Sequence, residues 1–147
     1  MSAANNKAII RRYYEEIGNQ RNLAVADELF APDFRLFPDS QPPYGPEGVK
    51  QFITWLCITN FPDLRVTIEE LIAEDDKVVA HVILHATQQV TMDWLPAVEP
   101  IPVTGKPFAM PEFVIWRLED GKIVERRVFI DFLAVVQQMG IQLVMSE

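Results

Sequence analysis

The sequence has few of the residues on which metal and covalent chemistry usually depend. Its 147 residues include one cysteine, Cys57, and two histidines. An internal disulfide, a thiolate metal cluster and a three-histidine zinc site are therefore excluded. The six glycines form no GxGxxG or GxxxxGK phosphate loop, and no Gly-x-Ser-x-Gly nucleophile motif is present. We expect neither a metal nor a cofactor.

Positive charge is also scarce. Thirteen Lys and Arg against 21 Asp and Glu give a formal net charge of -8, which opposes binding to nucleic acid and to anionic membranes. Residues 1–7 are polar with one cation, and the sequence has no run of about 18 apolar residues. We expect a cytoplasmic protein, with no nucleic acid and no membrane as partner. Its length and 49% hydrophobic content predict a single domain over residues 1–147.

The spacing of apolar residues changes about 60 residues into the chain. Spacings of three and four predict helices over 6–18, between Asn22 and Pro32, and over 46–60. Alternating or continuous apolar runs then predict strands over 64–69, 78–87, 108–118 and 123–130, and a short helix over 132–139. The run 78–87 is expected to be buried on both faces. This order predicts an α+β fold, a curved antiparallel sheet with helices on one side.

The dipeptide Asp120-Gly121 predicts a two-residue hairpin turn, which pairs Glu119 with Lys122. Pro111 cannot donate to a ladder, so its strand should be at an edge or bulged there. Counting outward without interruption places five side chains on one face: Met110, Glu112, Arg127, Phe129 and Asp131. The three charged residues form either a proton-transfer site or a set of ion pairs at a surface or interface.

The two histidines and one tryptophan are further candidates. His81 and His85 lie on one face of the strand 78–87, roughly 13 Å apart, so they cannot chelate one metal. A buried or interface position is open for both, and proton transfer or ligand binding for His81. Trp94 lies in a Pro-rich connection without periodic pattern, which indicates a lid over a cavity mouth.

Seven segments carry a family resemblance over nearly the whole chain, in order. They read KAIIRRYYEEIGNQ (7–20), LFAPDF (29–34), GPEG (45–48), FPDLRV (61–66), TGKP (104–107), EDGKIVE (119–125) and QQMG (137–140). They resemble the SnoaL-like polyketide cyclases of the nuclear-transport-factor-like superfamily. The resemblance implies a cone-shaped curved antiparallel sheet with the N-terminal helices on its concave side, and a homodimer through the outer sheet face.

The resemblance also implies a chemistry. Asp131 occupies the position of the family's acid/base aspartate, which removes a proton from carbon flanked by carbonyls so that an aldol reaction closes a ring. Arg127 or His81 would then polarise the carbonyl of a small apolar substrate. The residues expected to line the pocket are Tyr14, Phe37, Trp55, Trp94, Glu112 and Phe129.

Several positions depart from the family pattern. Many members have a polar pair ending in histidine at Leu36-Phe37, a histidine at Gln88, an arginine at His81 and a tryptophan at Arg127. These changes favour an apolar ligand with one anionic or carbonyl end. Three functions stay open: a cofactor-independent cyclase or isomerase using Asp131, a non-catalytic small-ligand-binding dimer, and a hydrolase or dehydratase using His81 with Glu112.

Overall fold

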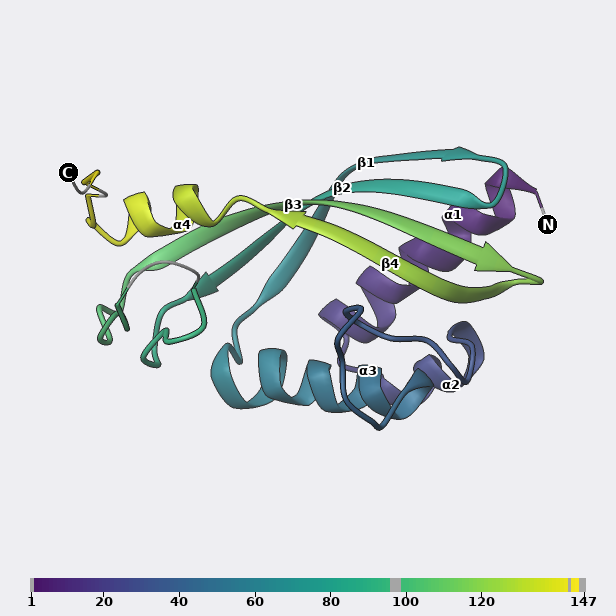
Figure 1. Ribbon diagram of the computed structural model, residues 1–147, viewed down its shortest axis with the longest axis horizontal. Coiled ribbons are helices and arrows are strands. Elements are labelled where there is room, and N and C mark those ends of the chain that lie inside the picture. The colour runs from purple at the N-terminus through teal and green to yellow at the C-terminus, as the bar shows by residue number, and fades with distance from the viewer. Residues whose placement is uncertain (1, 96–98, 143, 146–147) are drawn as a thin grey trace.

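An antiparallel sheet forms the frame of the protein, and helices cover one of its faces (Figure 1). A computed structural model of the chain describes residues 2–95, 99–142 and 144–145. The strands of this part follow one another in the sheet in chain order: β1 (Arg65–Glu74), β2 (Lys77–Thr87), β3 (Pro107–Glu119) and β4 (Lys122–Ile130). This meander with helices on its concave side confirms the predicted α+β fold.

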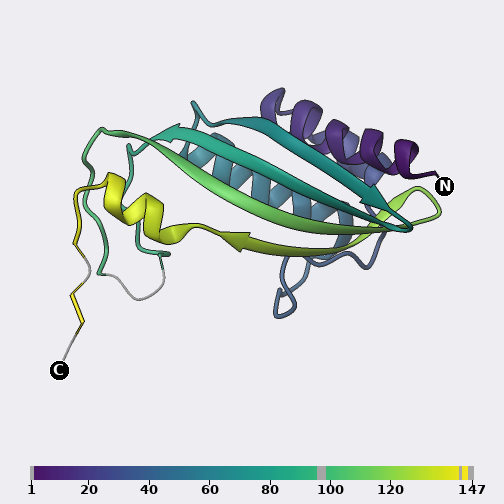
Figure 2. The same ribbon diagram turned by 90° about the horizontal axis from the view of Figure 1, so that it is seen from above.

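The predicted helices form where expected, each in two segments. They are α1 (Ala3–Arg12) with the π-helix η1 (Tyr13–Asn19), the 3-10 helix η2 (Leu23–Val25) with α2 (Ala26–Leu29), and α3 (Gly45–Ile53) with the π-helix η3 (Thr54–Asn60). Seen from above, they lie on one side of the sheet, and α4 (Phe132–Gln138) extends beyond the end of β4 (Figure 2). Among the described residues, no helix combines the length and apolarity that a membrane crossing needs.

Only one face of β2 is buried. Val78, Ala80, Val82 and Leu84 lie beneath the helices, whereas the alternate residues of the strand are half-buried. The expectation that residues 78–87 are buried on both faces is therefore wrong for the single chain, because the helices cover the concave face alone.

Aromatic rings join η1 to the concave face. The ring centroids of Tyr13 and Trp116 are 4.9 Å apart in an edge-to-face arrangement, and the Trp116 indole Nε1 donates to the Tyr14 hydroxyl at 3.1 Å. Phe30 packs edge-to-face on the Tyr13 ring at 5.6 Å. Such pairs add about 0.5–1.5 kcal/mol each to the stabilisation from burial.

An extra residue in β4 changes the pairing of the last two strands. Asp120 and Gly121 have φ angles of 48° and 77°, which confirms the predicted turn. The turn is followed by two regular pairs, Glu119 with Lys122 and Leu118 with Ile123. The next partner of β3 is then Glu125, opposite Arg117, so Val124 is inserted as a β-bulge. A one-residue shift turns every later side chain of a strand to the other face of the sheet.

The uninterrupted register predicted from the turn is therefore wrong beyond the bulge. Glu112 pairs with Ile130, and Trp116 pairs with Arg126. Glu112 and Arg126 consequently share the concave face, while Arg127 faces the convex side. The predicted patch of Glu112, Arg127 and Asp131 is not formed.

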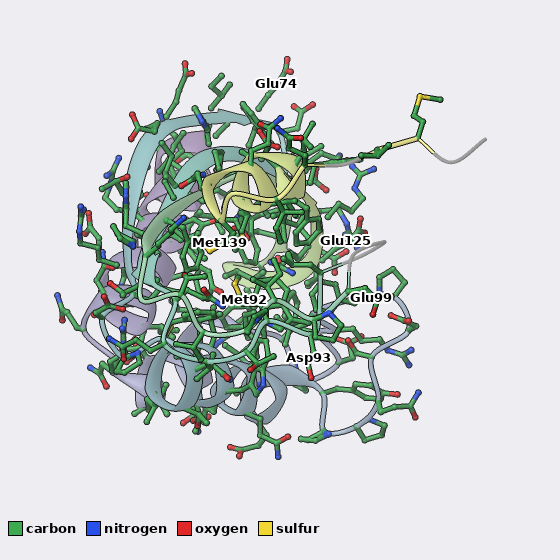
Figure 3. All side chains as sticks on the ribbon, turned by 90° about the vertical axis from the view of Figure 1, so that its left-hand side faces the viewer. Glu74, Met92, Asp93, Glu99, Glu125 and Met139 are labelled. Carbon is green, nitrogen blue, oxygen red and sulfur yellow. The ribbon has the colours of Figure 1, made fainter. Side chains whose placement is uncertain are left out.

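Pro111 lies in a regular stretch of β3, so the bulge considered there is absent; the β2–β3 register runs unbroken. β4 ends beside it, where the Asp131 amide donates to the Pro111 carbonyl at 3.0 Å. From there β3 is an edge strand, as the proline predicted. The side-chain amide of Gln138 replaces the missing neighbour, accepting from the Ala109 amide at 2.7 Å and donating to the Ala109 carbonyl at 2.8 Å. Figure 3 looks into this end of the molecule, with Met92 and Met139 near its centre.

Gly45 lets the chain return from the sheet to the start of α3. Its φ is +65°, and a Cβ atom added to it would lie 2.5 Å from the Pro32 carbonyl oxygen. Its amide donates to the Phe34 carbonyl at 2.7 Å. Both the left-handed backbone and the close approach require glycine here.

Replacing Gly45 should destabilise the protein through both effects. We expect Gly45→Ala to lower the free energy of unfolding by about 3 kcal/mol in urea titrations. Gly105→Ala is the matched control, since Gly105 has φ +70° with nothing within 4 Å of the added Cβ. It should cost only about 1 kcal/mol. Equal losses would show that contact with Pro32 is unimportant.

Candidate functional site

A cavity of about 230 Å³ lies between the concave face of the sheet and the helix formed by α3 and η3. Its lining is apolar and aromatic except for two charged residues, and consists of Phe37, Phe52, Trp55, Leu56, Leu84, Trp94, Met110, Glu112, Arg126 and Ile130. A narrow inner hollow of about 40 Å³ shares both charged residues and reaches Tyr13 and Tyr14. Glu112 and Arg126 are therefore the charged residues where the cavity meets its inner hollow.

Five of the predicted site residues come together here. Phe37, Trp55, Trp94 and Glu112 line the cavity, and Tyr14 lines its inner hollow. Trp94 packs edge-to-face on Trp55 with the ring centroids 6.2 Å apart. Trp94 therefore lies at the wall of the cavity, and its role as a lid stays a prediction.

Three other predicted residues lie on the convex face. The His81 ring stacks on the Phe113 ring, with centroids 4.4 Å apart and an interplanar angle of 9°. Arg127 is exposed and lies 3.4 Å from a Glu125 carboxylate oxygen, and Phe129 is 76% exposed. The pairing of His81 with Glu112 required by a hydrolase is wrong, because the two residues face opposite sides of the sheet.

Asp131 lies outside the cavity. It is exposed, and its Oδ1 accepts a hydrogen bond from the Ala134 amide at 2.9 Å, which caps α4. Its carboxylate forms no ion pair with Arg127. The catalytic role that the resemblance implies for Asp131 stays a prediction.

Glu112 is a buried carboxyl group in apolar surroundings. It is 6% exposed, and no described residue donates a hydrogen bond to it. Burial raises the pKa of Glu112 because the charged form loses its hydration, and the positive charge of Arg126 opposes part of this effect. A raised pKa makes the ionised carboxylate a stronger base, which can accept a proton and later return it.

Arg126 is a buried cation that the sequence reasoning missed. It is 8% exposed, and one guanidinium nitrogen donates to the Leu36 carbonyl at 3.2 Å. Its guanidinium carbon lies 5.2 Å from the centroid of the Phe37 ring and 5.8 Å from that of Trp116. Its Nε is buried without a hydrogen-bond partner among the described residues. An uninterrupted register treats Val124 as a paired residue, and it therefore places Arg126 on the wrong face.

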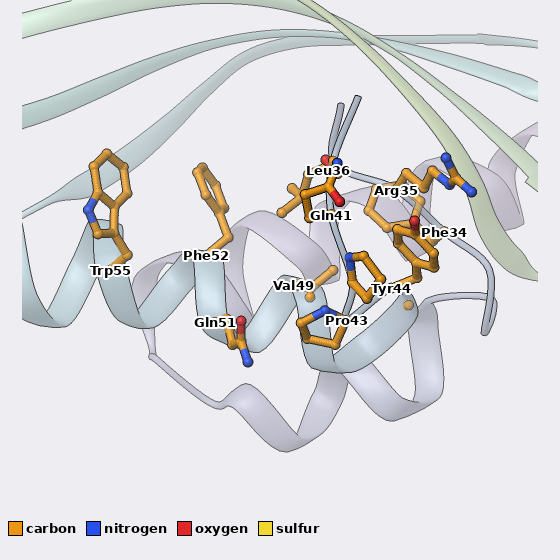
Figure 4. Close-up of a pocket in the computed structure, with 14 residues that line it drawn as sticks. Phe34, Arg35, Leu36, Gln41, Pro43, Tyr44, Val49, Gln51, Phe52 and Trp55 are labelled. Carbon is orange, nitrogen blue, oxygen red and sulfur yellow. The ribbon is translucent and has the colours of Figure 1, made fainter. Parts of the chain in front are cut away.

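The mouth of the cavity faces the loop 34–44. A second hollow of about 300 Å³ lies between this loop and α3 and shares Phe52 and Trp55 with the cavity. Figure 4 shows both of these side chains projecting from the helix towards the sheet. Phe37 and Trp55 are 41% and 42% exposed, so the cavity opens towards this hollow.

Comparison with known proteins places the chain in a family. The model of the SnoaL-like polyketide cyclase family matches residues 8–139. The chain belongs to this family. No curated protein matches the sequence. Among the described residues, no three His, Cys, Asp or Glu side chains gather in a group that could hold a metal ion.

Solved structures of similar fold cover almost the whole SnoaL-like domain. TsrD from Streptomyces laurentii is 22% identical with a TM-score of 0.78, over 95% of this chain and 98% of its own. A SnoaL-like polyketide cyclase from Agrobacterium tumefaciens is 20% identical with a TM-score of 0.76, over 95% and 100%. Wild-type IdmH from Streptomyces antibioticus is 28% identical with a TM-score of 0.68, over 92% and 99%.

Gln88, one of the departures from the family pattern, fastens the connection that carries Trp94. It is fully buried, and its amide nitrogen lies 3.1, 3.2 and 2.9 Å from the carbonyl oxygens of Val90, Ile101 and Pro102. Its amide oxygen accepts from the Thr104 backbone amide at 2.9 Å and from the Thr104 hydroxyl. This side chain therefore holds the two ends of the connection together.

Removing this amide should destabilise the connection, because buried backbone groups would lose their partners. We expect Gln88→Met to lower the free energy of unfolding by about 2–3 kcal/mol in urea titrations. Gln89→Met is the control, since Gln89 is exposed and its replacement should change stability by no more than about 0.5 kcal/mol. An unchanged free energy of unfolding in Gln88→Met would show that Gln88 does not hold the two ends of the connection together.

Proposed function

We propose that the protein is a cofactor-independent enzyme that transfers a proton on a small apolar carbonyl compound, with Glu112 as the general acid and base. One observation carries this proposal: a buried carboxyl group that accepts no hydrogen bond from the described residues and a buried guanidinium line the same apolar cavity and its inner hollow. Membership of the SnoaL-like family supports the same class of chemistry.

The reaction begins at carbon next to a carbonyl. The ionised Glu112 takes a proton from this carbon. The electron pair of the C–H bond forms a C=C bond, and the π pair of the carbonyl moves onto its oxygen to give an enolate. Arg126 stabilises the negative oxygen with the charge of its guanidinium. The enolate carbon then attacks a second carbonyl of the molecule, and Glu112 returns the proton to the new alkoxide. Return of the proton to another carbon would instead give an isomer.

Tyr13 and Tyr14 complete the inner end of the site as neutral groups. Burial raises the pKa of Tyr13 to about 12, and it raises the pKa of Tyr14 well above its ordinary value. Both phenols therefore keep their protons at neutral pH. They leave Glu112 as the acid able to exchange a proton there.

Exchange of α-carbon protons for deuterium tests the role of Glu112. We expect the protein to accelerate this exchange in 1-tetralone, a bicyclic ketone, as followed by proton NMR in D₂O. Glu112→Gln should reduce the acceleration by about 10²- to 10⁴-fold, because it removes the base. Glu119→Gln, at an exposed position at the end of β3, should behave as the wild type. No acceleration by the wild type would count against the proposal.

The same assay compares Glu112 with Asp131. Loss of exchange in Asp131→Asn with full exchange in Glu112→Gln would assign the role to Asp131, as the resemblance implies. Circular dichroism of each variant checks that its fold is retained.

We further propose that two chains associate through the convex sheet face. Ile72, Phe113 and Phe129 on this face are 55%, 54% and 76% exposed, and the strand pairing aligns Phe113 with Phe129. Exposed apolar side chains on adjacent strands are typical of protein interfaces.

Light scattering after size-exclusion chromatography tests this association. We expect twice the chain mass of 16.8 kDa for the wild type. Phe129→Glu should give the single-chain mass with an unchanged circular dichroism spectrum, because it buries a charge at the interface. Ile58→Glu places the same charge on η3, where Ile58 is 50% exposed, and should leave the dimer intact. A wild-type monomer would refute the proposal.

A further inference from the structure

The guanidinium of Arg126 forms no ion pair with an acid in the part of the chain that the structure describes. One described hydrogen bond, to the Leu36 carbonyl, uses one of its five N–H donors. Its Nε is buried without a partner among the described residues, and the other close groups are the faces of the Phe37 and Trp116 rings. A buried cation is costly unless an anion and further acceptors satisfy it.

Glu112 is the carboxylic acid that shares the cavity and the inner hollow with Arg126. The titratable groups that share the inner hollow and cavity with Arg126 are Glu112 from β3, Tyr13 and Tyr14 from η1, and Cys57 from η3. Burial raises the pKa values of both tyrosines, of Cys57 and of Glu112. Whenever Glu112 is protonated, the cavity therefore holds one positive charge and no negative charge.

The size of the cavity limits the ligand. Its volume of about 230 Å³ is below the roughly 300–1,000 Å³ of pockets that enclose drug-sized molecules. Aromatic side chains, Phe37, Phe52, Trp55 and Trp94, form much of the wall. A compact ring system fits these walls, whereas a molecule of four fused rings would extend beyond them.

We infer that the cavity selects a compact apolar molecule of about two fused rings that carries one negatively charged oxygen, and that Arg126 binds this oxygen. The inference rests on the proposed function and names its ligand class. The oxyanion is either a carboxylate of the substrate or the enolate formed from it. Both present an oxygen that can accept from the guanidinium of Arg126, whose described hydrogen bond uses one of five N–H donors.

The binding of a charged probe and of its neutral analogue, measured by isothermal titration calorimetry, tests the inference. We expect the wild type at pH 6 to bind 2-naphthoate at least about tenfold more tightly than 2-naphthamide, which has nearly the same shape. Arg126→Gln should lose this preference while its affinity for 2-naphthamide stays within about twofold. Equal binding of the two probes by the wild type would overturn the inference, as would an unchanged preference in Arg126→Gln.

The pH dependence gives a second measurement, which does not require the Arg126 variant to fold. Measured from pH 5 to pH 9, affinity for 2-naphthoate should fall as rising pH ionises Glu112, because the ionised carboxylate repels the bound anion. Glu112→Gln should bind 2-naphthoate with an affinity that does not change over this range. A fall of the same size in Glu112→Gln would contradict the inference.

Two further probes test which group of the ligand carries the negative charge and how large a ring system the cavity admits. At pH 6, tighter binding of 2-naphthoate than of 2,4-dinitrophenolate, which is also ionised at this pH, supports a substrate carboxylate, and the reverse supports the enolate. Pyrene-1-carboxylate, with four fused rings, should bind about tenfold more weakly than 2-naphthoate; tighter binding would overturn the size limit.

The two assays separate this inference from the proposed function. If deuterium exchange is lost in Glu112→Gln while the wild type binds acid and amide equally, the inference fails and the proposed function stands. If binding is selective for charge while exchange is unaffected by Glu112→Gln, the inference stands and Glu112 is not the base.

Discussion

The inserted residue Val124 decides which chemical groups the sheet presents to the interior. With an uninterrupted ladder, β4 would direct Glu125, Arg127 and Phe129 towards the helices. The bulge instead directs Arg126, Val128 and Ile130 inward. A β-bulge also bends its strand and increases the local twist, which suits a sheet that curves over helices. One backbone irregularity therefore shapes the concave face and supplies its cation.

The interior that results is an unfavourable place for charge, and this makes Glu112 and Arg126 informative. Each could be replaced by an apolar side chain of similar size without loss of packing, and such replacements are often neutral or stabilising. The sequence nevertheless keeps a buried carboxyl group and a guanidinium whose Nε, like that carboxyl group, has no hydrogen-bond partner among residues 2–95, 99–142 and 144–145. Groups that cost stability in this way cluster at functional sites.

Most of the fold could be predicted from the sequence, because its signals are local. Apolar spacing located the helices and strands, and the Asp120-Gly121 dipeptide located the turn with its positive φ angles. The register beyond the turn could not be obtained by counting alone. A signal was present: the apolar residue before the bulge, Ile123, is at an odd position, whereas Val128 and Ile130 are at even ones. This change of parity within one strand is what an inserted residue produces.

The candidate site was predictable only in part, since it depends on that register. Phe37, Trp55, Trp94 and Tyr14 belong to segments whose placement does not involve β4, and they reach the cavity or its inner hollow. Glu112 reaches it through β3. Arg127 and Phe129 lie on β4 beyond the bulge, and each lies on the face opposite to the predicted one.

The buried side-chain amide of Gln88 affects how a ligand can enter and leave the cavity. The Gln88 side chain forms hydrogen bonds to both ends of the connection that carries Trp94. The wall formed by Trp94 is therefore preorganised, and ligand binding costs little conformational entropy for ordering it. The segment on the other side of the cavity has weaker restraints: the Phe37 ring lies against the Arg126 guanidinium, which also donates to the Leu36 carbonyl. An anion that binds Arg126 competes with these two contacts. Binding of the anion and release of the segment that carries Phe37 are therefore thermodynamically linked.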